Sequence, residues 1–193
     1  FRNPSTSPDL SAMATRTPQG RKAAALTELE EAIHLAPQAL LYSNDYRALV
    51  RRYGSAFYDR SIRFFEELAV EHPDLVMPKL NQSLAYVDKM PYPKLGIVSQ
   101  GQLSNKSLAV LDTILEQDPK CWTAKFIRGM NHLHWPRKLN HAPLAIRDFT
   151  ELIALQKTLP PEKQREYFAL GYVGLGDAYV KNRDEGFDEN TRR

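Results

Sequence analysis

Three of the five histidines in this chain lie within ten residues, at His132, His134 and His141. Histidine is a common ligand of transition metals, and two ligands separated by one residue can reach one ion where the backbone is extended. Pro136 indicates that a helix ends just before it, so an extended backbone is available there. The segment holds no carboxylate or thiol to complete a metal site. On the histidines alone, one hypothesis is a ligand-binding or metal-binding subunit that uses His132, His134 and His141.

Basic side chains offer a second kind of chemistry. Arg47 and Arg51 are four residues apart, so on a helix they share a face and could meet phosphates or acidic side chains. The net charge of +3 is too small to indicate nucleic-acid binding by itself. Aromatic residues are not interleaved with the basic ones, as a base-stacking surface requires. A nucleic-acid adaptor is a third-ranked hypothesis, and we expect no nucleic-acid partner.

Motifs for catalysis are not evident. Ser99-x-Gly101 lacks the flanks of a nucleophile elbow, and Lys94-x-Gly96 lacks the rest of a phosphate-binding loop. Cys121 is the single cysteine, which excludes an internal disulfide. It falls at a predicted helix start, where its pKa could be lowered, but no base accompanies it. We therefore expect that the protein is not an enzyme and needs no cofactor.

The elements that position these residues are set by a pattern that occurs four times. Each copy has a small residue, an apolar residue directly after it, and further apolar residues at the spacing of one helix face. The copies begin at Ala25, Ser61, Ser107 and Ala145. In the first three copies a proline follows at the same interval, at Pro37, Pro73 and Pro119. Because proline fits the first turn of a helix but not its interior, it separates each helix from the next.

A second helix is expected after each proline, over 38–53, 75–89, 121–134 and 163–181. Gly129 and Gly176 fall inside two of these helices. A glycine there costs about 1 kcal/mol relative to alanine, so each needs a reason, and close contact between helices supplies one. His132 occupies the position that Tyr86 and Tyr179 occupy in other copies. The alternative to metal binding is therefore a buried His132 that packs under the loop that follows it.

The phrases Leu175-Gly176-x-x-Tyr179 and Ala145-x-x-x-Phe149, with the closing prolines, resemble the tetratricopeptide repeat (TPR), a helix–turn–helix unit of about 34 residues. The resemblance covers about residues 18–193, as three to four divergent repeats. It implies an all-α fold, a right-handed α-solenoid of TPR-like helix-turn-helix repeats. It also implies protein binding without catalysis, as a scaffold or as an accessory subunit of a multi-subunit complex.

The chain departs from a regular array in three places. Insertions fall near 91–103 and 135–141, and insertions in a solenoid become loops, often on the binding side. Residues 184–187 look like the start of another turn and helix. Terminal repeats normally carry a polar cap, so we expect either a missing C-terminal helix or a partner over the last repeat.

Residues 1–17 are rich in Pro, Ser and Thr, which indicates a flexible linker or an N-terminal tail. The first residue is Phe1, not Met. Together these features favour an exported or membrane-tethered protein, with a lost N-terminal anchor as its expected contact with a membrane. No apolar run approaches the roughly 20 residues of a membrane-spanning helix.

In TPR proteins the first helix of each repeat lines a concave groove, and the helices that correspond to it here are those expected after each proline. Carried over by position, the groove residues here are Met77, Leu80, Asn81, Leu84, Val87, Phe126, Met130, Leu133, Val173 and Asp177. Most of them are apolar, which implies an apolar helix or an extended segment of a partner as the ligand. The alternative is that these residues pack between repeats. The Lys, Arg and Asn cluster with which chaperone-binding members hold a terminal carboxylate is not evident in this sequence.

Overall fold

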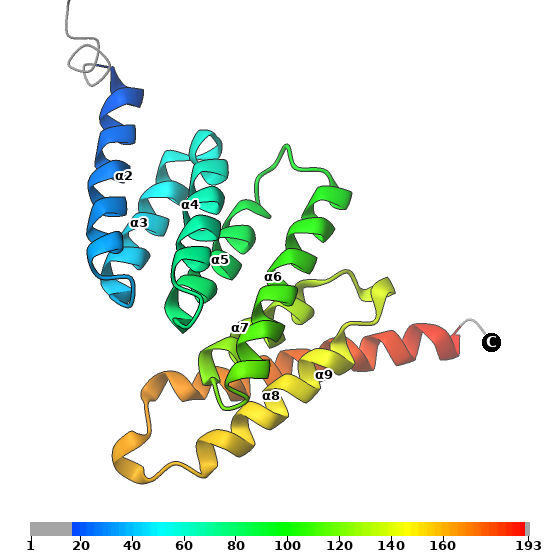
Figure 1. The fold of residues 1–193 in the computed structure, drawn as a ribbon. Helices are drawn as coiled ribbons and strands as arrows, with labels where there is room; N and C mark the ends of the chain where they lie inside the picture. Colours follow the sequence, from blue (N-terminus) through cyan, green and yellow to red (C-terminus); the bar gives the residue numbers. More distant parts are fainter. Residues whose placement is uncertain (1–16, 192–193) are drawn as a thin grey trace, which may run out of the picture. The chain divides into compact units, whose positions relative to one another are not determined.

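The structure is a computed structural model that describes the backbone of residues 17–191 and the side chains of residues 17–182. All regular elements in this part of the chain are α-helices or short 3-10 helices (Figure 1). The predicted all-α fold is therefore confirmed. The chain divides into two compact units, Phe1–Tyr92 and Pro93–Arg193, which we call unit 1 and unit 2.

Unit 1 consists of two helical hairpins. The first pairs α2 (Pro18–Leu35) with α3 (Leu40–Tyr53), and the second pairs α4 (Tyr58–Glu71) with α5 (Val76–Lys89). Gly54, with φ of 89°, ends α3 in a backbone conformation that favours glycine. The 3-10 turn η1 (Ser55–Phe57) follows it and leads into α4. The core is built from the repeated apolar positions, and Leu26, Ile33 and Phe65 are fully buried.

Unit 2 also consists of two hairpins, α6 (Ile97–Gln117) with α7 (Trp122–His134), and α8 (Ala142–Lys157) with α9 (Ala169–Thr191). Helix α7 packs against α6, α8 and α9. The turn η2 (Arg137–Leu139) lies between α7 and α8, and η3 (Pro161–Lys163) and η4 (Glu166–Phe168) precede α9. The core of this unit is formed by Leu111, Phe149 and Leu152, each without exposed surface.

The three prolines at the repeat interval form the same turn. The amide of Ala39 donates to the carbonyl of Ala36 at 2.9 Å. The amides of Leu75 and Cys121 each donate in the same way to the carbonyl three residues earlier, at 3.1 Å. Proline is the second residue of each turn, where its fixed φ is already suitable. The spacing of these prolines therefore determines where α3, α5 and α7 begin.

The helices differ from the sequence-based expectation in three places. Residues 97–103 of the first insertion extend α6 at its start, because this segment contains no proline and a single glycine, Gly101. Residues 161–168 form two 3-10 turns, since Arg165 is extended, so α9 begins at Ala169 and not at residue 163. The backbone of α9 then continues to Thr191, past the turn expected at 184–187.

The N-terminal segment predicted to be a tail lies outside the described residues, apart from Thr17. The Thr17 hydroxyl accepts a hydrogen bond from the Gly20 amide at 2.9 Å and so caps the start of α2. Over the part of the chain that the structure describes, none of the helices combines the length and the apolar character needed to cross a membrane.

Candidate partner-binding site

The three histidines near the end of α7 do not converge on one point. The Nδ1 atoms of His132 and His141 are 3.0 Å apart, so one neutral ring donates a hydrogen bond to the other. His134 is exposed, and its Nδ1 donates instead to the carbonyl of Met130 at 2.7 Å. The described residues contain no group of three or more His, Cys, Asp or Glu side chains that could hold a metal ion. The metal hypothesis therefore gains no support.

The His132–His141 pair fastens the loop after α7 to the helix. Burial lowers the pKa of His132 to about 4, and the attraction of Asp148 only partly opposes this effect. Burial also lowers the pKa of His141, as does the nearby charge of Lys181. The Trp135 ring stacks on His141, with ring centres 4.3 Å apart and an interplanar angle of 11°. The two neutral histidines and the Trp135 ring therefore form a packed contact between α7 and the loop that follows it.

The arginines considered for phosphate binding pair with a carboxylate of their own unit. Arg47 makes two hydrogen bonds to Asp88 of α5, at 2.7 Å from Nε and 3.1 Å from Nη2. Arg51 Nη1 donates to the same carboxylate at 2.9 Å. Of the two roles that the sequence left open for this pair, contact with an acidic side chain is the one observed. The nucleic-acid hypothesis is not supported by these contacts.

Cys121 immediately precedes the first turn of α7, as the proline spacing indicates. Burial raises the pKa of its thiol, and hydrogen bonds with the backbone of Ala124 and Thr123 only partly offset the effect of burial. The thiol form is therefore favoured at neutral pH, so this cysteine is not an activated nucleophile.

The predicted groove residues of unit 1 lie on α5 and differ in exposure. Met77, Leu84 and Val87 are half-buried, whereas Leu80 and Asn81 are 5% and 1% exposed. The Asn81 side-chain amide donates to the carbonyl of Met77 at 3.0 Å. Within this unit, a partner could therefore contact Met77, Leu84 and Val87 but not the two buried residues.

The predicted groove residues of unit 2 lie on α7 and α9. On α7, Phe126, Met130 and Leu133 are half-buried against a core cluster formed by Ala145, Phe149 and Ala178. On α9, Val173 is 59% exposed, and Asp177 is exposed beside it. The α7 residues thus support the core, and Val173 and Asp177 are the more accessible of the set.

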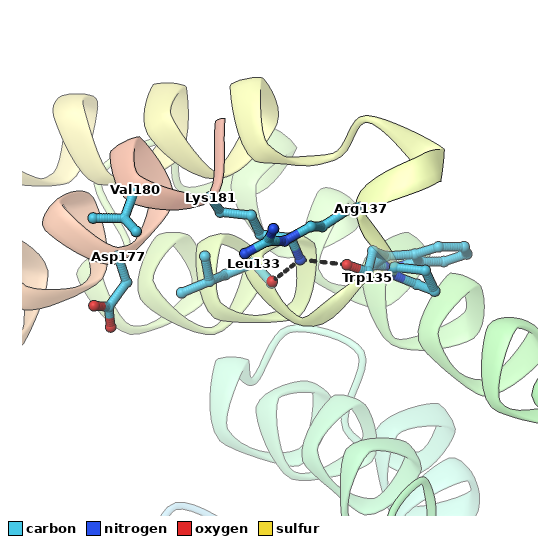
Figure 2. Close-up of a pocket in the computed structure, with 7 residues that line it drawn as sticks. Leu133, Trp135, Arg137, Asp177, Val180 and Lys181 are labelled. Carbon is cyan, nitrogen blue, oxygen red and sulfur yellow. Dashed lines mark hydrogen bonds between the residues drawn. The ribbon is translucent and has the colours of Figure 1, made fainter. Parts of the chain in front are cut away.

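A shallow pocket of about 400 Å³ lies between the end of α7, its loop and α9. Two predicted groove residues, Leu133 and Asp177, contribute to it (Figure 2). The full lining consists of Leu133, Trp135, Pro136, Arg137, Asp177, Val180 and Lys181. The sequence predicted that the second insertion is a loop, but it did not place Trp135 or Val180 beside the predicted groove residues.

Lys181 fixes the geometry of this pocket. Its ammonium group donates to the carbonyl of Leu133 at 2.5 Å and to the carbonyl of Trp135 (Figure 2). The last carbonyls of a helix lack partners within the helix and carry its partial negative charge, so a cation stabilises them. The contact joins α9 to the end of α7 and leaves the pocket open between them.

Helix α9 carries an apolar surface next to the pocket. Leu170, Val173 and Val180 are 49%, 59% and 63% exposed. Asp177 lies among them, and it has no hydrogen bond or ion pair to another residue of the described part of the chain. Exposed apolar side chains beside a carboxylate that has no partner among the described residues are more typical of a binding surface than of an ordinary solvent-exposed helix.

Repeated helical hairpins, with an exposed apolar surface on the last of them, define the class of this protein as an all-α helical-repeat solenoid. No protein-family model and no curated protein matches the chain. Its structure is similar to that of a thermophilic TPR protein from Thermus thermophilus, with a TM-score of 0.57 and 18% sequence identity. The similarity covers 95% of this chain and 86% of that chain, and it shows a TPR-like fold.

Proposed function

We propose that this chain is a non-catalytic interaction module that acts as a scaffold or accessory subunit by binding an apolar segment of a partner protein. The observation that carries the proposal is the α9 surface of Val173, Asp177 and Val180, which continues into the pocket beside Leu133. A TPR-like fold supports a role in protein interaction in general. The surface is apolar, so burying it against a partner releases water and favours association.

The chemistry of the surface limits what it binds. Valine and leucine side chains fit a helix or an extended segment with apolar anchors, and the pocket volume of about 400 Å³ is enough for a large anchor side chain. Asp177 favours a ligand with a basic residue next to its anchor, because an unpaired carboxylate at the edge of an interface gains a partner there. In unit 1, Met77, Leu84 and Val87 form a second candidate surface.

The first experiment is affinity capture from the native source with the tagged chain and a Val173→Glu variant. Val173 is 59% exposed, so the substitution adds a charge to the surface without entering the core. The matched control is Val70→Glu on α4, because Val70 is 79% exposed and lies outside the proposed surface. We expect one stoichiometric partner that is retained by Val70→Glu and lost with Val173→Glu. A partner that binds all three forms equally would contradict this assignment of the surface.

The unit 1 residues are tested by the same capture with Leu84→Glu. Because Leu84 is half-buried, the helical content and melting temperature of the variant must first match those of the parent chain. Loss of a partner that Val173→Glu retains would assign that contact to α5. Retention with both variants would exclude both surfaces.

A further inference from the structure

Helices α7 and α9 occupy equivalent places in consecutive repeats. Other helices cover α7 on both of its sides, whereas one side of α9 is open. Gly129 of α7 corresponds to Gly176 of α9, and His132 corresponds to Tyr179. A Cβ atom at Gly129 would be 3.0 Å from the Phe149 ring of α8, whereas a Cβ at Gly176 would meet nothing within 4 Å. The position that α8 fills on α7 is therefore open on α9.

The cover that α8 provides for the Gly129 side of α7 includes the Phe149 ring and several polar contacts. Phe149 lies on Gly129, and the Trp122 indole donates to the Gln156 side chain at 3.0 Å. Two ion pairs flank these contacts. They join Lys125 to Glu151 at 2.6 Å, and Arg128 to Asp148 at 2.6 and 2.8 Å.

The corresponding surface of α9, which we call the Gly176 face, consists of Ala169, Tyr172, Gly176 and Tyr179. Tyr172 is 50% exposed and Tyr179 is 54% exposed, and the two other residues are exposed as well. The opposite side of α9 is already packed on α8, through Gly171, Gly174 and Ala178. A helix that is apolar on both sides needs cover on both sides, and a polar outer surface would be expected if none were present.

We infer that the Gly176 face is a docking surface, separate from the Val173–Asp177 surface, for a helix of a partner protein. That helix places an aromatic or large apolar side chain over Gly176, as α8 places Phe149 over Gly129. Charge complementarity sets its other contacts. The positions of Lys125 and Arg128 are occupied on α9 by Tyr172 and Leu175, so carboxylates like those of α8 would lose their partners there.

The partner helix is therefore uncharged or basic where it touches α9, and not acidic. Asp177, on the adjoining Val173–Asp177 surface, adds to this preference because it has no partner among the described residues. A second copy of this chain is a poorer occupant. Its α8 already covers its own α7, and its own Gly176 face carries no basic side chain to oppose Asp177.

The test uses a synthetic peptide with the sequence of α8, residues 142–157, with Asp148→Asn and Glu151→Gln. This peptide keeps the Phe149 anchor and removes the two carboxylates. Its binding to the full chain is measured by fluorescence anisotropy. We expect binding that weakens by about tenfold or more when the peptide also carries Phe149→Ala, the loss typical of a buried aromatic anchor. The unmodified α8 peptide should bind more weakly than the neutralised one.

The protein variant is Gly176→Leu, whose side chain occupies the open position. It should fold with unchanged helical content, because no atom lies within 4 Å of the new Cβ, and it should lose the peptide. Val173→Glu should keep the peptide, so failure of this inference is distinguishable from failure of the proposed function. Equal binding to the parent chain and to Gly176→Leu, or no binding by the parent chain, would overturn the inference. Sedimentation equilibrium that shows a dimer dissociated by Gly176→Leu would overturn it in favour of a second copy.

Discussion

Phe149 of α8 lies directly on Gly129 of α7, with its ring 3.0 Å from the position that a Cβ at Gly129 would occupy. Gly174 of α9 approaches the same ring, and a Cβ there would be 2.5 Å from it. Phe149 has no exposed surface. The two glycines thus allow three helices of unit 2 to approach one aromatic side chain. Close contact between helices, expected at both Gly129 and Gly176, is therefore found at Gly129 but not at Gly176, where a Cβ would meet nothing within 4 Å.

The first prediction concerns Gly129→Ala. Alanine is the better helix former by about 1 kcal/mol, but its methyl group would press on a fully buried ring that the backbone of Gly174 also approaches closely. Overpacking of this kind costs about 1–3 kcal/mol, so we expect a net loss of stability. Urea denaturation followed by circular dichroism measures it. A variant at least as stable as the parent chain would show that the ring can move.

Gly176→Ala should have the opposite effect. A Cβ at Gly176 meets nothing within 4 Å, so only the gain in helix propensity remains. We expect the free energy of unfolding to rise by about 1 kcal/mol or slightly less. The same urea titration serves both variants. A decrease for Gly176→Ala would mean that this position is already covered in solution.

The second prediction concerns Asp88, which accepts hydrogen bonds from both Arg47 and Arg51. The side chains of Arg47 and Asp88 are each 10% exposed, so Asp88→Asn leaves a buried guanidinium without its counter-charge. We expect a loss of about 3 kcal/mol in the free energy of unfolding. The control is Asp59→Asn. Asp59 pairs with Lys89 but is 69% exposed, and its loss should cost less than about 1 kcal/mol. Equal effects of the two substitutions would contradict a buried role for Asp88.

The third prediction concerns pH. The pKa of His132 is about 4 in the folded chain against 6.5 for an ordinary histidine, so the unfolded chain binds the proton more readily. The contribution of neutral His132 to stability is therefore complete above pH 6.5 and is lost as the pH falls toward 4. The difference between the two pKa values corresponds to about 3 kcal/mol at most.

His132→Gln should remove this part of the pH dependence. The check is the urea midpoint of the parent chain and of the variant between pH 4 and pH 7.5. The difference between the two curves isolates His132 from the carboxylates that titrate in the same range. Curves that remain parallel over the whole range would contradict the predicted protonation behaviour of the His132–His141 pair.

The fourth prediction separates the two kinds of groove residue. Met130 packs against the cluster of Ala145, Phe149 and Ala178, so Met130→Glu places a charge beside the core and should destabilise unit 2 by several kcal/mol. Val173→Glu, at a position that is 59% exposed, should stay within about 0.5 kcal/mol of the parent chain. Thermal unfolding measures both. A stable Met130→Glu variant would contradict the core role of Met130 and would show that its side chain is accessible to a partner.

Several features of the fold could be predicted from the sequence because they depend on neighbouring residues. Pro37, Pro73 and Pro119 each lie in a four-residue turn closed by a hydrogen bond, so the starts of α3, α5 and α7 agree with the expected starts to within two residues. The helical period likewise identified the buried positions, such as Phe65, Leu111 and Phe149. Local preference was insufficient before α9, where Pro160 and Pro161 are followed by 3-10 turns and not by the expected helix.

The candidate site was only partly predictable. Helix position places Met130 and Val173 on comparable faces, but α8 packs beside one and leaves the other exposed. The partners of charged residues were equally unpredictable. Arg47 pairs with Asp88 of a different helix, and Lys181 donates to a carbonyl at the end of α7. The sequence by itself determined the apolar faces of the helices and the starts of the helices that follow Pro37, Pro73 and Pro119, since these follow from local conformational preference and period. Only the tertiary structure decided which faces are covered and which charges are paired, because these depend on residues distant in the chain.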